Sequence, residues 1–258
     1  MLFMRLKLIS LNLWQGGKLW QEIVDFLERE KPDILALQEV YESREPHPEQ
    51  RYRSMTKLQE ALPYLSFYQF APTLTGLSLD GVPYREGNAV FSKFELKQRG
   101  VHFFDVPYGE FDYAGTAFDP ARAPRNIQHV VADINGTDLN IFNLQGIWGK
   151  NELDNERRMN MGKTVAKLVA GREHALLCGD FNVDIKTRSI AQIEEAGLVN
   201  IFKGKIESSM NTLRRPQEIF GKITPDTIFI SPDLKLISAD CPKVDISDHL
   251  PQIITFEI

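Results

Sequence analysis

An apolar run in the last third of the chain ends abruptly in polar side chains. Ala175–Cys178 is followed directly by Gly179-Asp180-Phe181-Asn182. A short apolar run of this kind predicts a buried strand, and side chains two apart on a strand project to the same side. We therefore expect Asp180 and Asn182 to face one target at the edge of a sheet. The alternative is an ordinary turn, because Asp and Asn are common turn formers.

Two earlier strands are predicted to end in the same way. Met4–Leu13 has a strand pattern and carries Asn12 near its end. Asp33–Val40 is a second apolar run, and it carries Glu39 at its end. Between the two strands, apolar residues at helical spacing predict a helix over Lys18–Glu30. A strand–helix–strand order predicts an α/β arrangement whose functional residues lie at the carboxyl ends of the strands.

The middle of the chain has an antiparallel pattern instead. Asn135-Gly136 is a strong hairpin signal between two predicted strands. The further strands that we predict are 88–92, 98–104, 127–134, 139–144, 226–231 and 252–257. The further predicted helices are 54–62, 152–170 and 187–196, and the predicted loops are 41–53, 71–87 and 105–124.

The last of these loops is rich in aromatic and acidic residues. Its aromatic residues include Tyr108, Phe111, Tyr113 and Phe118. Aromatic loops can stack on bases or sugars, but four acids against one base in this loop disfavour contact with a polyanion. A packed lid without ligand contact is the equally weighted alternative.

Composition and charge limit the classes of protein and partner. The 258 residues are 43% hydrophobic and carry a net charge of −5. These values are ordinary for a globular protein and argue against a strong basic surface for nucleic acid. Two cysteines provide neither a disulfide framework nor zinc spacing. With no leader-like segment and no apolar run of about 18 residues, we expect a cytoplasmic protein without a membrane span.

Seven polar residues at or beside predicted strand ends form a candidate site. They are Asn12, Glu39, Asp180, Asn182, Asp226, Asp248 and His249. Four carboxylates at close range would repel one another strongly without a cation. This oxygen-rich set suits Mg²⁺, with Mn²⁺ as an alternative, and is poor for zinc. A divalent ion beside an Asp and a His is suited to the hydrolysis of a phosphate ester.

Four short motifs occur in the order seen in the endonuclease/exonuclease/phosphatase superfamily, which the chain resembles. They are Ile9–Asn12, Leu37–Val40, Gly179–Asn182 and Ser247–Pro251. The resemblance spans nearly the whole chain. It implies one domain over residues 1–258 with both α/β and α+β character. The implied fold is a four-layer α/β/β/α sandwich of two packed mixed, largely antiparallel sheets, with the site at one end.

The same resemblance implies a role for each candidate residue. Glu39 would be the main metal ligand, helped by Asn12 and Asp248. The catalytic residues would be Asp180, Asn182, His249 and Asp226. Asp180 would activate the attacking water, and Asn182 would hold a phosphate oxygen. His249 would polarise the phosphate, and Asp226 would orient its imidazole.

One position departs from the pattern of the superfamily. Gln145 stands where the superfamily usually has a histidine, and a Gln amide can donate a hydrogen bond but cannot carry a proton or a positive charge. The expected result is weaker activity or a different substrate. Gln145, Asn143 and Asn88 are the residues that we expect to contact the substrate.

These observations predict a divalent-metal-dependent hydrolase of phosphate esters. It would be either a phosphodiesterase, with nuclease activity as one form, or a phosphomonoesterase. Its substrate would be DNA, RNA, a lipid head group or a small molecule. Two alternatives stay open: a catalytically weakened or inactive phosphate- or metal-binding module of the same fold, motivated by Gln145, and a carboxylate cluster that holds structural calcium.

Overall fold

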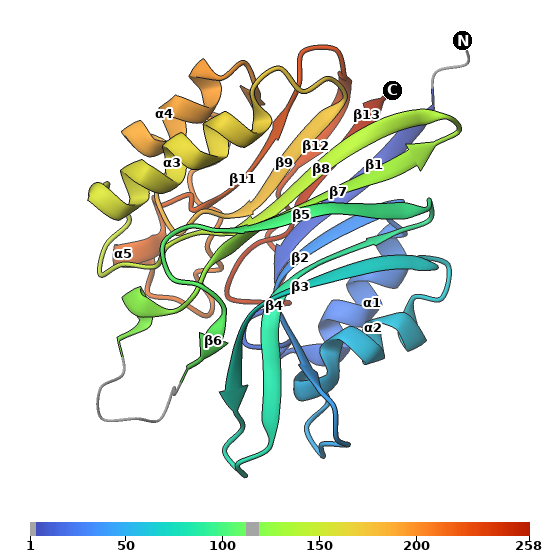
Figure 1. Ribbon diagram of the computed structural model, residues 1–258, viewed down its shortest axis with the longest axis vertical. Helices are drawn as coiled ribbons and strands as arrows, with labels where there is room; N and C mark the ends of the chain where they lie inside the picture. Colours follow the sequence, from blue (N-terminus) through green and yellow to red (C-terminus); the bar gives the residue numbers. More distant parts are fainter. Residues whose placement is uncertain (1–3, 112–118) are drawn as a thin grey trace.

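Two β-sheets form the centre of the molecule in a computed structural model, which describes residues 4–111 and 119–258 (Figure 1). The first sheet has seven strands in the order β12 (Lys235–Asp240), β13 (Gln252–Glu257), β1 (Arg5–Asn12), β2 (Ile34–Ser43), β4 (Pro83–Ser92), β3 (Phe67–Leu77) and β6 (Gly109–Glu110). The second has six in the order β10 (Val199–Asn200), β11 (Asp226–Ile230), β9 (Ala175–Asp180), β8 (Thr137–Gln145), β7 (Asn126–Ile134) and β5 (Leu96–Phe103). These counts refer to the described residues.

Helices cover the outer face of each sheet (Figure 1). On the first sheet lie α1 (Trp20–Glu30) and α2 (Ser54–Ala61), and on the second lie α3 (Glu156–Val169) and α4 (Arg188–Glu195). Parallel pairing joins β1 to β2 and β8 to β9, whereas most other pairs are antiparallel. The predicted α/β/β/α sandwich of two mixed, largely antiparallel sheets is therefore confirmed.

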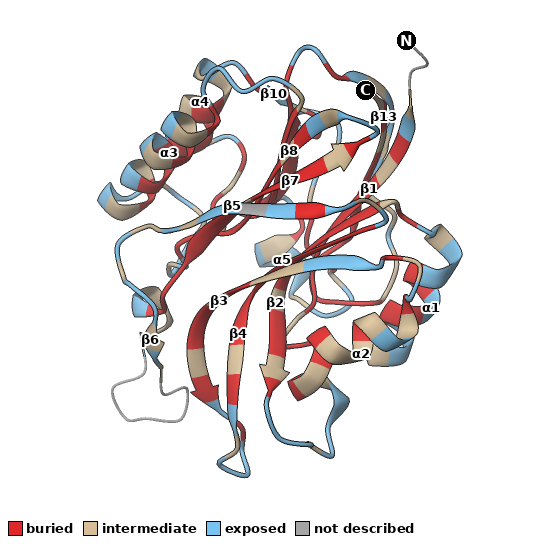
Figure 2. Ribbon diagram, turned by 45° about the vertical axis from the view of Figure 1, so that its right-hand side comes forward, coloured by how far each residue is buried: buried red, intermediate tan, exposed pale blue. Residues whose placement is uncertain are grey.

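Strands with apolar residues on both sides build three hydrophobic layers. On β1, Leu8 belongs to the cluster between the two sheets, whereas its neighbour Ile9 packs with Phe26 under the α1 and α2 helices. Ile141 and Leu177 show the same division in the second sheet, between the sheets and under α3 and α4. Figure 2 shows the result as central strands that are buried along most of their length, whereas β5 at the edge of its sheet is largely exposed. Each fully buried side chain of this kind stabilises the fold by about 1.5–3 kcal/mol.

Most of the predicted helices and strands are present, and the hairpin is confirmed. Ile134 pairs with Thr137, and Asn135 and Gly136 both have positive φ, as a two-residue hairpin turn requires. The helix predicted over 152–170 begins only at Glu156, because Asn155 caps it by accepting a hydrogen bond from the Arg158 backbone N–H.

The loop predicted over Ala71–Gly87 is wrong. Strands β3 and β4 pair through this region and leave only a short turn between Leu77 and Pro83. Pro72 favours a loop in the sequence, but it lies at a register shift between Pro72 and Leu74 where the ladder is interrupted. The bulge therefore accommodates the proline inside a strand.

Other boundaries also differ from the predictions. The region predicted as a loop over 41–53 contains the end of β2 and a 3₁₀ turn over Gln50–Arg53. The loop predicted over 105–124 contains β6 and a 3₁₀ turn over Pro120–Arg122. Three further elements were not predicted: β10, β12 and the short helix α5 (Gln217–Phe220). Their weak apolar periodicity explains the omission.

The aromatic residues predicted in the 105–124 loop are only partly described. Tyr108 lies next to β3, where its hydroxyl is 2.7 Å from the Thr75 Oγ1. The Phe111 backbone N–H also donates to Thr75 O, at 2.9 Å. Tyr113 and Phe118 lie outside the described residues.

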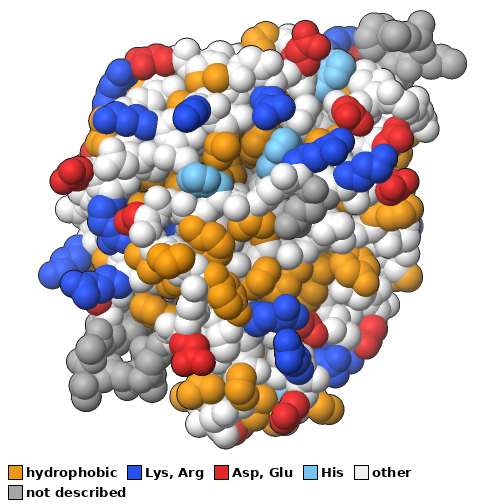
Figure 3. Space-filling view, in the orientation of Figure 1, with side chains coloured by type: hydrophobic (Ala, Val, Ile, Leu, Met, Phe, Trp, Pro, Cys, Tyr) orange, Lys and Arg blue, Asp and Glu red, His pale blue; other side chains and the backbone are white. Residues whose placement is uncertain are grey.

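Hydrophobic side chains gather across the middle of the face shown in Figure 3, between groups of Lys, Arg and acidic side chains. The neighbouring strands β3 and β5 run through this region of the molecule (Figure 1). Phe67 and Tyr68 on β3 are among the exposed large hydrophobic residues. No helix within the described part of the chain is long and apolar enough to cross a bilayer.

Candidate metal and phosphate site

The strand ends predicted to meet do meet, and a single amide joins them. The Asn12 Nδ2 at the end of β1 donates to Glu39 Oε1 and to Asp180 Oδ2, at 3.1 Å in each case. Glu39 belongs to the first sheet, and Asp180 ends β9 of the second. Two carboxylates from different sheets therefore lie within hydrogen-bond distance of the same side chain.

The backbone around Glu39 is shaped to present its carboxylate. Glu39 has φ 54° and lies in a register shift between Leu37 and Val40, so the β2 ladder is interrupted there. Its Oε2 accepts from the Gln15 backbone N–H at 2.6 Å, and its Oε1 also accepts from Gln145 Nε2 at 2.9 Å. A non-glycine residue in the left-handed region is uncommon and occurs often at functional positions.

The imidazole of His249 is held by Asp226 at the start of β11, and Asp226 is held in turn by Ser209. The His249 Nδ1 lies 2.9 Å from Asp226 Oδ2 and 3.1 Å from Asp226 Oδ1. The Ser209 hydroxyl donates to Asp226 Oδ2 at 2.6 Å. This arrangement fixes the orientation of the imidazole ring, as carboxylate partners do for functional histidines. Sequence patterns give no signal for Ser209, whose partner is seventeen residues away.

An arginine neutralises Asp248. The Arg215 Nε donates to Asp248 Oδ2 at 2.9 Å, and its Nη2 contacts the same oxygen. The preceding Ser247 donates through its hydroxyl to the Asn12 backbone carbonyl at 2.7 Å, so this loop is tied to the end of β1. In the sequence, Arg215 stands out only by the Arg-Arg-Pro run at 214–216, which by itself does not predict a contact with Asp248.

Asp180 and Asn182 form a tight turn at the end of β9. The Asn182 backbone N–H donates to Asp180 Oδ1 at 2.8 Å, and Asn182 has φ 55°. Its side-chain Nδ2 donates to the Gly146 carbonyl at 3.0 Å. The turn that was the alternative prediction is therefore present, and it brings both side chains to the candidate site.

The residues present fit a divalent cation. One ligand atom from each of Asp180, Asp226 and His249 lies within 4.8 Å of the others. Glu39 and Asp248 add two further carboxylates to this region, so oxygen donors dominate, as hard cations require. Asn12 is less simple, because its Oδ1 accepts from the Trp14 backbone N–H at 2.9 Å and its N–H groups face the carboxylates.

Burial and neighbouring charges raise the pKa values of two acids and of the histidine in this site. Burial raises the pKa of Asp180 above its usual 3.8; the His249 charge counteracts this shift, and the Asp226 carboxylate adds to it. Burial likewise raises the pKa of Asp248. Burial alone would lower the pKa of His249, but Asp226, Asp180 and Asp248 together raise it well above 6.5. The three carboxylates therefore favour the protonated form of His249.

A pH-dependent contribution to stability follows for the metal-free protein. The pKa of His249 is higher in the folded than in the unfolded state, so its contribution is full below about pH 6.5 and is lost as the pH rises through the raised pKa. Urea unfolding in EDTA measures this contribution as the difference in unfolding free energy between wild type and His249→Gln. We expect this difference to shrink above pH 6.5. A difference that grows with pH would contradict the assignment.

Two residues expected to contact the substrate instead connect the sheets. The Asn143 Nδ2 on β8 donates to the Leu37 and Ala89 carbonyls of the first sheet, at 2.9 and 3.1 Å. The Asn88 Nδ2 on β4 donates to the Asn126 carbonyl of the second sheet at 3.1 Å. Both residues are fully buried. The structure therefore places the side chains of Asn143 and Asn88 between the two sheets.

Gln145 is buried beside Glu39, next to an arginine that the sequence patterns do not single out. The Arg125 Nη1 donates to Gln145 Oε1 at 3.0 Å and to Glu86 Oε1 at 3.2 Å. Glu39, Glu86 and Arg125 line a cleft of about 790 Å³. The rest of its lining is mainly polar and aromatic, with a few aliphatic side chains. These lining residues are Gln15, Lys18, Tyr41, Arg51, Tyr52, Leu77, Ser78, Leu79, Gly81, Tyr84, Pro120 and Trp148.

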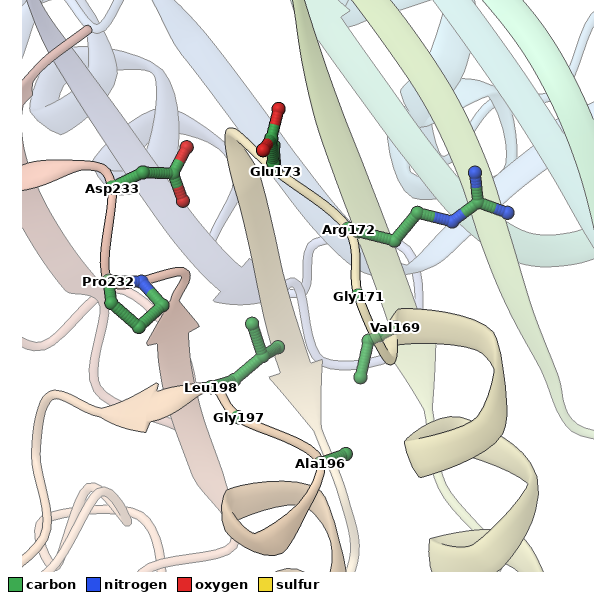
Figure 4. A pocket seen from close by; sticks show the side chains of 9 residues that line it. All are labelled: Val169, Gly171, Arg172, Glu173, Ala196, Gly197, Leu198, Pro232 and Asp233. Atoms are coloured by element: carbon green, nitrogen blue, oxygen red, sulfur yellow. The ribbon is translucent and has the colours of Figure 1, made fainter.

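A smaller hollow lies at the other end of β9. Its volume is about 390 Å³, and its lining includes Arg172, Glu173 and Asp233. Figure 4 shows Arg172 pointing away from the two acids. β9 begins at Ala175, beside this hollow, and ends at Asp180. The hollow therefore lies at the opposite end of the strand from the site and contains none of the predicted site residues.

Fold and site together define the class. The chain is a four-layer α/β/β/α sandwich with buried carboxylates and a histidine at its strand ends. The chain is a member of the endonuclease/exonuclease/phosphatase family, whose model matches residues 9–249. A comparison with curated proteins gives no match.

Solved structures share this fold at low sequence identity. An endonuclease/exonuclease/phosphatase from Beutenbergia cavernae is 19% identical, with a TM-score of 0.77 over 98% of this chain and 72% of that chain. The mannosyl-6-phosphatase of Bacteroides thetaiotaomicron is 19% identical, with a TM-score of 0.66 over 97% and 99%. D. rerio TDP2 complexed with a single-strand DNA product is 18% identical, with a TM-score of 0.63 over 98% and 98%.

Proposed function

We propose that this protein is a divalent-metal-dependent hydrolase that cleaves phosphate esters by attack of water on phosphorus. The observation that carries the proposal is the contact of Asn12 with both Glu39 and Asp180, at 3.1 Å each, next to His249. A buried carboxylate such as Asp180 close to the half-buried Glu39 is costly unless a cation or a substrate group compensates their charge. Mg²⁺ suits these oxygen donors best, and Mn²⁺ is the alternative.

In the proposed mechanism, Glu39 and Asp248 hold the cation, with Asn12 beside them. When bound, the cation supplies Lewis-acid stabilisation of the developing negative charge. Asp180 accepts a proton from the attacking water, and its raised pKa makes it a better base than an exposed carboxylate. His249, whose ring Asp226 orients, holds the phosphate.

Asn182 completes the polar contacts on the same side. Its side chain is fixed by the Gly146 carbonyl at 3.0 Å, which limits its rotation. A donor held in place before the substrate arrives costs little reorganisation when negative charge develops. In the proposed mechanism Asn182 therefore binds a phosphate oxygen next to Asp180.

The cleft favours a compact substrate. Its volume of about 790 Å³ lies within the range of sites for small ligands, and the chain has a net charge of −5. The structural relatives include a mannosyl-6-phosphatase and TDP2 with a DNA product, so both small and polymeric phosphate esters occur among proteins of this fold. A non-hydrolysing module that binds a metal or a phosphate is the second candidate, favoured by Gln145 at the place of the usual histidine.

Metal removal tests the proposal. We expect release of p-nitrophenol from p-nitrophenyl phosphate or its bis ester in Mg²⁺ or Mn²⁺, and loss of this release in EDTA because the carboxylates of the site cannot stabilise the transition state alone. Restoration by added Mg²⁺ serves as the control for irreversible damage. Calorimetric metal binding without turnover on any phosphate ester would favour the module instead.

A further inference from the structure

The chain passes through a left-handed turn between β1 and α1, directly beside Glu39. The four residues of this turn are Trp14, Gln15, Gly16 and Gly17, with φ values of 61°, 52°, 78° and 96°. Glycine alone adopts such a conformation routinely, and usually as a single residue. A run of four residues that includes Trp and Gln is therefore unfavourable by itself and must be held by the contacts around it.

The backbone N–H groups of the left-handed turn are directed at the candidate site. The Gln15 N–H donates to Glu39 Oε2 at 2.6 Å, and the Gly16 N–H donates to the Glu39 backbone carbonyl at 2.9 Å. The Trp14 N–H donates to Asn12 Oδ1 at 2.9 Å. Successive backbone N–H groups in a turn can hold an anionic group. Three consecutive N–H groups of the turn thus bind two residues of the site, Asn12 and Glu39.

The hydrogen bonds to the Glu39 carboxylate leave one of its oxygen atoms less occupied than the other. Oε1 accepts from Asn12 Nδ2 at 3.1 Å and from Gln145 Nε2 at 2.9 Å. Within the described part of the chain, Oε2 accepts only from the Gln15 N–H. An ionised carboxylate has about two acceptor positions on each oxygen. Oε2 therefore keeps a lone pair for a cation, and the left-handed turn fixes the direction of that lone pair.

Gly16 allows the turn to come this close to Glu39. A Cβ at position 16 would lie 2.4 Å from the Arg51 backbone oxygen and 2.8 Å from the Tyr41 ring. Tyr41 lies on β2, two residues after Glu39, so the turn is packed directly on the segment that carries the carboxylate. An alanine at position 16 would fit only if the turn moved away from Tyr41 and Arg51. Such a movement would lengthen the hydrogen bond from Gln15 to Glu39.

We infer that the left-handed turn positions Glu39 for the cation and that Gly16 is the positioning residue that makes this contact possible. This inference rests on the proposed function, because the cation is the one that the proposed hydrolase requires. The Gln15 N–H holds the carboxylate in place before the cation arrives. A ligand that is ordered in advance binds more tightly, since less ordering remains to be done on binding. Replacement of Gly16 should therefore weaken metal binding although residue 16 supplies no ligand atom.

The competing interpretation is a turn that only connects β1 to α1. In that case Gly16→Ala lowers the stability of the fold and leaves the Mg²⁺ affinity of the folded protein unchanged. Gly204 provides the matched control, because it also has a positive φ, 73°, and a Cβ there would meet nothing within 4 Å. Gly204→Ala therefore introduces a comparable backbone strain without disturbing Glu39.

Calorimetric titration with Mg²⁺ separates the two interpretations. We expect Gly16→Ala to raise the Kd for Mg²⁺ at least about 10-fold, as loss of a hydrogen bond to a charged group implies. Gly204→Ala should stay within about two-fold of wild type, as expected for a distant, independent position. Thermal unfolding shows that each variant is folded at the temperature of the titration. A Kd of folded Gly16→Ala within about two-fold of wild type would overturn the inference.

Amide hydrogen exchange in EDTA provides a second readout that needs neither the metal nor a folded Gly16→Ala. The Gln15 amide of wild type should exchange at least about 10-fold more slowly than in Glu39→Ala, because the Glu39 carboxylate is its acceptor. Equal exchange rates would also overturn the inference. If the Mg²⁺ affinity depends on Gly16 but no phosphate ester is cleaved, the proposed function fails while the positioning role stands. If esters are cleaved and the Mg²⁺ affinity does not depend on Gly16, the positioning role fails while the proposed function stands.

Discussion

Replacement of Asp180 by asparagine is expected to lower kcat by about 10²–10⁴-fold, the usual contribution of a general base. Asp180 is fully buried at the end of β9, where Asn12 Nδ2 and the Asn182 backbone N–H donate to its two oxygens. Asparagine keeps the shape of the side chain but cannot accept a proton. The loss should appear in kcat more than in KM, because the role of Asp180 belongs to the transition state.

The control for this substitution lies on the neighbouring strand. Asp138→Asn changes the same group at an exposed position of β8, seven residues before Gln145, and should leave kcat unchanged. Near-ultraviolet circular dichroism and thermal unfolding establish that both variants are folded. Activity of Asp180→Asn within about five-fold of wild type would remove Asp180 from the mechanism.

Replacement of Gly179 by alanine is expected to destabilise the fold by about 3–5 kcal/mol, through overpacking combined with backbone strain. Gly179 has φ 142°, a conformation that side chains rarely adopt. A Cβ at this position would also lie 2.0 Å from the Leu144 carbonyl oxygen on β8. Because Leu144 and Gly179 are paired in the sheet, neither backbone can move away without breaking the ladder.

Gly171→Ala separates the two causes of this loss. Gly171 also has a positive φ, 67°, but a Cβ there would meet nothing within 4 Å. We therefore expect a cost of only about 1–2 kcal/mol, from the backbone conformation alone. Urea unfolding of both variants measures the difference. Equal costs would show that the close approach to Leu144 does not constrain Gly179.

The strand-end residues were visible in the sequence because polar groups directly after an apolar run stand out. Asn12, Glu39 and Asp180 each follow or end such a run, and the structure brings all three within hydrogen-bond distance of one another through Asn12. Local patterns also predicted the hairpin at Asn135-Gly136. These features depend on residues close in the chain, and for that reason they needed no knowledge of the packing.

Local patterns failed where pairing between distant segments decides the outcome. Pro72 favoured a loop, but a register shift places it inside β3. Asn143 and Asn88 have residue types that suit substrate contact, yet their side chains cross the space between the sheets. The side of a strand that faces the other sheet is set by the packing of the two sheets. A single strand does not encode it.

The sequence by itself determined the fold class, the family and the residues that carry charge to one end of the sheets. Only the tertiary structure decided the partner of each charge: Arg125 beside Gln145, Arg215 on Asp248 and Ser209 on Asp226. Electrostatic interactions depend on distance and burial, and both arise only when strands far apart in the chain pack together. The glutamine that looked like a lost charge in the sequence therefore lies, in the folded protein, against a guanidinium.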